Sequence, residues 1–125
     1  MEKELGIIES TQLGFGDHGI FTFCINFDFG SSGQGFGGIG LNDYDKEKKK
    51  RIGSVFGGTV IMRILEAVGV EWWDDLIGKE MWVYRDRMKI HGIEAPKYRK
   101  GGGKFMIQDL IDECRISDET GDKDE

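Results

Sequence analysis

Two neighbouring residues, Asp17 and His18, have side chains of the kind that general acid–base chemistry uses. A histidine takes up and releases a proton near neutral pH, and a nearby carboxylate can orient its ring. The pair lies in residues 11–19, whose glycines predict a turn, and Cys24 follows on a predicted strand. One hypothesis is therefore an enzyme that acts on nucleotides or nucleic acid with His18 as base. The alternative is structural, with Asp17 capping its turn and His18 bonding to backbone, and we assign no catalytic residue.

The glycine-rich segment 30–40 offers a different chemistry, the binding of an anion. Hydroxyl and amide side chains lie there among glycines, whose exposed N–H groups can line a concavity that receives a phosphate. Arg85 is one of several cations that can supply positive charge. We therefore predict a binding site for a nucleotide or phosphate that consists of Asp17, His18, Ser31, Ser32, Gly33, Gln34, Gly35 and Arg85. The alternative is that the glycines allow two backbones or two subunits to approach closely.

Two other kinds of site are not expected. A metal centre would have to use His18 and His91 with a carboxylate such as Asp28, which is too small and too scattered a set of ligands, so we expect no metal and no cofactor. Residues 33–38 match the G-x-G-x-x-G pattern after a predicted strand. No helix opens directly after them, however, and residues 48–65 contain no acid to bind a ribose, so the dinucleotide-binding interpretation is rejected.

A sheet has to position these residues, and the clearest strand precedes the glycine-rich segment. Apolar and polar side chains alternate there with a period of two, which predicts a strand with one apolar face: Phe21, Phe23, Ile25, Phe27 and Phe29 form that face. The other predicted strands are residues 5–10, 34–41, 79–85 and 88–94. Residues 42–53 are predicted to be a charged loop.

One helix is predicted with both of its ends. Ser54 is the expected N-cap, apolar residues recur at three- and four-residue steps through residue 68, and Gly69 is the expected stop. A short helical turn is expected at Trp72 and Trp73, and a last docking helix at residues 105–111. The order β-β-β-α-β-β predicts an α+β fold, in which an antiparallel sheet of about five strands packs one face against the main helix.

Charge divides the chain into two parts. The net charge is −6, and residues 112–125 alone hold seven acids against two basic residues. We therefore expect a single α+β domain at 1–112 and an acidic, disordered tail at 113–125. The basic run 46–51 is interpreted as a solvated loop, and no nucleic-acid partner is expected. No secretory signal or membrane span is found, and the two cysteines lack paired spacing, so we expect a cytoplasmic location.

Several short motifs taken together resemble a known group of sequences. The motifs are Ile8–Gly14 (IESTQLG), Asp17–Ile20 (DHGI), Gly30–Gly38 (GSSGQGFGG), Ile64–Glu66, Val68–Glu71 and Trp73–Leu76. The pattern is similar to a family of short proteins from bacteriophage and prophage genomes that usually carry no assigned function. The likeness covers roughly residues 7–93, and the basic run 46–51 and the acidic end depart from it. The resemblance implies a phage origin and transfers no catalytic residues.

From this resemblance and the lack of a catalytic constellation, we expect a small non-enzymatic binding protein in the host cytoplasm. Its expected use is counter-defence, by sequestering a nucleotide signal or by blocking a host defence protein. The alternatives are the nucleotide- or nucleic-acid-processing enzyme with His18 and Asp17, and a structural or assembly protein of the virion. We also expect a homo-oligomer, because one helix leaves part of the sheet uncovered and Trp72, Trp73 and Trp82 provide apolar area to bury.

Overall fold

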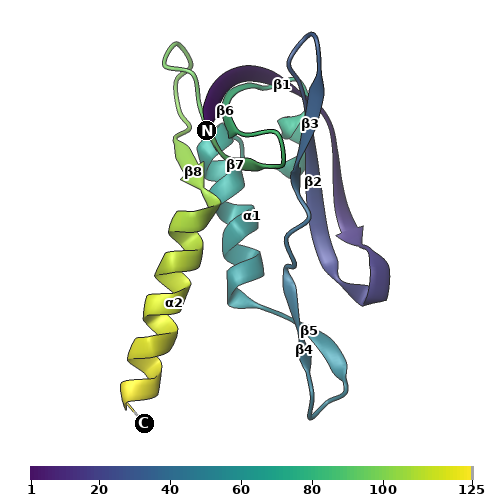
Figure 1. Ribbon diagram of the computed structural model, residues 1–125, viewed down its shortest axis with the longest axis vertical. Helices are drawn as coiled ribbons and strands as arrows, with labels where there is room; N and C mark the ends of the chain where they lie inside the picture. Colours follow the sequence, from purple (N-terminus) through teal and green to yellow (C-terminus); the bar gives the residue numbers. More distant parts are fainter. Residues whose placement is uncertain (125) are drawn as a thin grey trace.

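A six-stranded antiparallel sheet is the main layer of the protein, as a computed structural model of the chain shows (Figure 1). The model describes the backbone of residues 1–124 and the side chains of residues 1–115. The strand order is β3-β2-β1-β6-β7-β8. The strands are β1 (Glu2–Phe15), β2 (Phe21–Asp28), β3 (Gly33–Gly37), β6 (Glu80–Arg85), β7 (Ile90–Glu94) and β8 (Lys104–Met106). The predicted α+β class with an antiparallel sheet is confirmed, with one strand more than expected.

The first strand is the longest and joins the two halves of the sheet. Its residues 2–7 pair with β6 and its residues 7–15 pair with β2, with a bulge between Ile8 and Ser10. The prediction of a short strand at residues 5–10 was therefore wrong in extent. The prediction missed residues 2–4, which are charged and alternate in sign. They form a strand because they pair with β6, and their own composition does not indicate it.

The sheet curls until its two edges approach each other. Phe36 on edge strand β3 and Phe105 on edge strand β8 have ring centroids only 6.3 Å apart. The alternating face predicted for β2 does point into this core, where Phe23, Ile25 and Phe27 are at most 1 % exposed. The curled sheet thus encloses the core, and its convex face carries the alternate residues of β6 and β7.

Helix α1 (Val55–Val68) covers the open side of the core, and its predicted ends are confirmed. The Ser54 side chain accepts a hydrogen bond from the Gly57 N–H, and Gly69 adopts the left-handed conformation with φ 85°. Gly57 is needed for packing, because a Cβ atom there would lie 1.9 Å from the carbonyl oxygen of Leu41. The chain that follows the glycine-rich strand therefore sets how closely α1 approaches.

Residues 42–53 are not a loop, as predicted, but a second, two-stranded sheet of β4 (Asn42–Asp45) and β5 (Lys50–Gly53). Its turn is closed by the Asp45 carboxylate, which accepts hydrogen bonds from the N–H groups of Glu47 and Lys48 at 2.9 and 3.1 Å. Lys49 takes a positive φ of 55° in this turn. A side-chain-capped turn thus allows a hairpin in a segment that has almost no apolar residues.

Two 3-10 turns and a C-terminal helix complete the chain. Turn η1 spans Asp17–Gly19, and η2 (Trp73–Leu76) confirms the predicted helical turn. Helix α2 (Ile107–Asp124) docks through Leu110, which is 2 % exposed. Residues 113–124, which are most of the tail that the sequence predicts to be disordered, lie in α2, and residue 125 falls outside the described residues. In the described part of the chain no helix is long and apolar enough to cross a membrane.

Candidate functional site

The predicted ligand-binding residues do not form one site, because they lie at opposite ends of β2. Asp17 and His18 are exposed in η1 before the strand, while Ser31 and Ser32 are exposed in the turn after it. The eight residues of β2 separate the two turns by about 25 Å, at roughly 3.3 Å per residue. The Asp17–His18 turn therefore lies far from Ser31 and Ser32. The other end of segment 30–40 does approach the start of β2, where the Thr22 hydroxyl donates to the Ile39 carbonyl at 2.8 Å.

The η1 turn instead contacts the second sheet. The His18 carbonyl accepts a hydrogen bond from Arg51 Nε at 3.3 Å, and the Gly19 carbonyl accepts one from Asn42 Nδ2 at 3.1 Å. His18 itself takes a positive φ of 58°. These contacts hold the backbone of the turn in place and direct neither the Asp17 carboxylate nor the His18 ring at a partner that could react.

The glycines of β3 bring that strand close to its own neighbour, β2. A Cβ atom at Gly35 would lie 2.8 Å from Cys24 Sγ, and one at Gly37 would lie 2.1 Å from the carbonyl oxygen of Phe23. Gly37 also has a φ of 151°, which side chains disfavour. The absence of side chains at these two positions therefore serves close packing within the chain.

Gln34 and Arg85 are the two predicted site residues that do come together. Arg85 Nε donates to Gln34 Oε1 at 2.6 Å, and Arg85 Nη1 lies 2.5 Å from Glu4 Oε2. The guanidinium also stacks over the Phe29 ring at 4.5 Å. Because a carboxylate, an amide and an aromatic face already engage it, Arg85 supports the edge of the sheet and is poorly placed to receive a phosphate.

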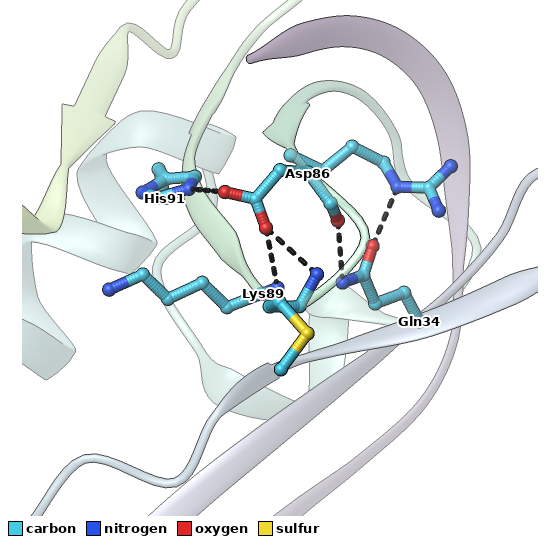
Figure 2. A network of polar contacts seen from close by, with 6 residues as sticks. Gln34, Asp86, Lys89 and His91 are labelled. Atoms are coloured by element: carbon cyan, nitrogen blue, oxygen red, sulfur yellow. Dashed lines mark hydrogen bonds and ion pairs between the residues drawn. The ribbon is translucent and has the colours of Figure 1, made fainter.

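Sequence reasoning missed an aspartate–histidine pair beside this contact, which Figure 2 shows with Gln34 and Lys89. Asp86 Oδ2 lies 2.6 Å from His91 Nε2, and Asp86 Oδ1 accepts from the N–H groups of Met88 and Lys89. The bond to His91, followed by these two backbone bonds, lowers the pKa of Asp86 to about 2. Gln34 Nε2 donates to the Asp86 carbonyl at 3.2 Å. The network thus closes the β6–β7 turn and ties it to β3.

The convex face of the sheet holds a pocket of about 410 Å³ that no prediction included. Strand β6 alternates so that Met81 and Val83 are buried in the core while Trp82 and Tyr84 point outward. The pocket extends from Trp82 to the loop after β7, and its lining is Lys3, Leu5, Trp82, Glu94, Ala95, Pro96, Lys97 and Tyr98. Its volume falls within the range of small-molecule sites. The alternation along 79–85 was a readable signal, but it does not reveal which loop completes the pocket.

Cations and aromatic rings are combined in this pocket. Lys3 Nζ lies 5.2 Å from the ring centroid of Trp82 and 5.6 Å from that of Tyr84. It also lies 3.2 Å from Glu94 Oε1, the oxygen that accepts the Tyr84 hydroxyl at 2.6 Å. The Tyr84 hydrogen bond is the main cause that lowers the pKa of Glu94, and the bond to Glu94 raises the pKa of Lys3. Lys104 covers Tyr84 as well, with Nζ at 4.8 Å from the ring centroid.

A second hollow of about 480 Å³ lies at the β1–β2 hairpin and has a different character. Its lining, from Gln12 to Gly16 with Thr22, Phe23, Cys24 and Gly38, contains no charged residue. Burial raises the pKa of the Cys24 thiol, which keeps it protonated and a poor nucleophile. This hollow therefore lacks the charged groups that would orient a polar ligand.

The described residues hold no group of three or more histidine, cysteine, aspartate or glutamate side chains that could bind a metal ion. Of the two hollows described above, the pocket on the convex face is the one that combines lysines with aromatic rings, so it is the best candidate site. It is called the outer-face pocket below.

Comparison with protein-family models, with curated proteins and with solved structures gives no match, so the similarity to phage proteins stays a prediction.

Proposed function

We propose that this chain is a small phage-encoded binding protein that captures a nucleotide in the outer-face pocket and so acts against a host defence in the host cytoplasm. The observation that carries the proposal is the pairing of an aromatic surface, Trp82 with Tyr98, and two lysines, Lys3 and Lys97, in one pocket. A nucleotide needs both features, since its base stacks on aromatic rings and its phosphate pairs with ammonium groups.

Size and charge favour a small nucleotide over a nucleic acid. A pocket of about 410 Å³ accommodates a ligand of mononucleotide size. The whole chain carries a net charge of −6, which repels a long polyanion, while the pocket lining has two lysines against one carboxylate. Local positive charge on an acidic protein suits a compact anion that contacts only this pocket.

Binding is favoured over catalysis because the pocket lining contains no histidine, cysteine, serine or threonine, and its one carboxylate, Glu94, already accepts from Tyr84 and Lys3. Glu94 has a lowered pKa and stays an acceptor at neutral pH. Asp17 and His18, the residues of the enzyme hypothesis, lie in η1 and are not part of the lining. Holding a nucleotide signal away from its receptor requires no reaction, so this arrangement suffices for the proposed role.

The β1–β2 hairpin supports a second candidate, contact with another protein chain. Beyond Ile8, β1 pairs only with β2, and Leu13 and Phe15 are 40 % and 77 % exposed. A strand edge that carries no charge from Ser10 to Phe15 and has exposed apolar side chains suits either self-association or docking on a host protein. Light scattering of the purified chain tests the first of these, and a mass equal to one chain would contradict a homo-oligomer.

The nucleotide proposal is tested by calorimetric titration of the full chain with mononucleotides. Trp82→Ala removes the stacking surface and should weaken binding about 5- to 150-fold, since one base–aromatic stack contributes about 1–3 kcal/mol. Trp72→Ala is the matched control, because Trp72 is 70 % exposed and lies outside the pocket lining. Equal affinities for the two variants, or no binding by the wild-type protein, would contradict the proposal.

A further inference from the structure

We infer that Glu94 selects, among nucleotides, those whose base carries an exocyclic amino group. The inference rests on the proposed function, because it assigns the part of the ligand that the outer-face pocket reads. It concerns one carboxylate oxygen and the base edge that would face it.

Glu94 has one oxygen in use and one available. Oε1 accepts from the Tyr84 hydroxyl at 2.6 Å and from Lys3 Nζ at 3.2 Å, which occupies both of its lone pairs. Oε2 has no hydrogen-bond partner among the side chains of residues 1–115. The side chain is 30 % exposed and lines the pocket, so Oε2 is accessible to a ligand.

The register of the sheet places this oxygen next to the stacking surface. Trp82 and Glu94 are direct partners across β6 and β7, and directly opposed residues on one face have Cβ atoms about 5 Å apart. A base that stacks on Trp82 therefore brings its edge to Glu94. The Lys3 side chain lies over Trp82 and is 46 % exposed, so it can move aside for the base and turn toward the phosphate of the ligand, while the Tyr84 hydroxyl still holds Glu94 Oε1.

An ionised carboxylate accepts hydrogen bonds and donates none, which decides between the bases. Adenine and cytosine present an amino group that donates to Glu94 Oε2. Uracil presents its single N–H between two carbonyl oxygens, which would face the carboxylate and repel it. A site that only accepts hydrogen bonds leaves the acceptor groups of a mismatched ligand unpaired. We therefore expect adenosine and cytidine monophosphates to bind at least about tenfold more tightly than uridine monophosphate.

The experiment measures the dissociation constants of adenosine, cytidine and uridine monophosphates, which share ribose and phosphate. Glu94→Gln supplies an amide that can donate to uracil, so the preference should fall toward equal affinity. Glu66→Gln is the control, since it makes the same charge change on the exposed face of α1 and should keep the preference.

Each result decides a different claim. Equal affinities for the three nucleotides in the wild-type protein would overturn the role of Glu94 and leave nucleotide capture standing. A preference for adenosine and cytidine monophosphates that Glu94→Gln does not reduce would also overturn the role of Glu94 and leave nucleotide capture standing. Binding of none of the three would overturn both the role of Glu94 and the proposed function.

Discussion

Gly57 and Gly58 are adjacent in α1, yet alanine should have opposite effects at the two positions. A Cβ atom at Gly57 would lie 1.9, 2.6 and 2.7 Å from the O, C and Cα atoms of Leu41, whereas one at Gly58 would meet nothing within 4 Å. Carbon atoms in van der Waals contact keep about 3.5 Å, so Gly57→Ala forces the helix start away from the chain after β3. Overpacking of this kind costs about 1–3 kcal/mol.

Gly58→Ala lacks that clash and gains helix propensity, which stabilises the protein by up to about 1 kcal/mol. Gly57→Ala gains the same helix propensity, so the two variants should differ in the free energy of unfolding by the overpacking cost alone, about 1–3 kcal/mol. Urea denaturation followed by circular dichroism measures this difference by linear extrapolation. The packing argument would be refuted if Gly57→Ala stabilised the protein as much as Gly58→Ala, or if both left the midpoint unchanged.

Two further predictions concern the β6–β7 turn and the edge strand β3. The pKa of Asp86 is lowered from 3.8 to about 2 in the folded protein, so its contribution to stability is present above pH 4 and is lost as the pH falls toward 2. The melting temperature of the wild-type protein should exceed that of Asp86→Asn above pH 4, and this difference should shrink as the pH falls from 4 toward 2. A difference that stays constant with pH would contradict the lowered pKa of Asp86. Gly37→Ala should lower the melting temperature, because the positive φ of Gly37 disfavours a side chain and a Cβ atom there would clash with β2. Gly53→Ala is the control and should not lower it, because the space around a Cβ atom at Gly53 is open. Similar melting temperatures for the two variants would show that close packing does not require glycine at position 37.

The elements that sequence reasoning found are those whose signals are local. Ser54 and Gly69 mark the ends of α1 through hydrogen bonds and dihedral angles that involve only a few neighbouring residues. Alternation from Phe21 onward marks β2 because every second side chain enters the core. The β4–β5 hairpin was missed because its pairing depends on a turn that the Asp45 carboxylate caps. The spacing of hydrophobic residues along the sequence does not indicate such a turn.

The candidate site depended on information that is not local. Turns 17–19 and 29–32 are close in the sequence, but β2 places them at its two ends. Arg85 does lie against Gln34, yet its charge is engaged by Glu4, which is distant in the sequence. The outer-face pocket requires the cross-strand register that sets Trp82 beside Glu94, and register follows only from the folded sheet.

The central claim is that a nucleotide stacks on Trp82, and the three tryptophan indole N–H signals in a ¹H–¹⁵N correlation spectrum test it most directly. Trp82 lines the pocket, Trp72 is exposed elsewhere, and Trp73 Nε1 donates to Thr11 Oγ1 at 3.2 Å on the other face of the sheet. Saturating adenosine monophosphate should shift the Trp82 signal and leave the other two in place. An unchanged Trp82 signal, or shifts confined to Trp72 and Trp73, would contradict the account.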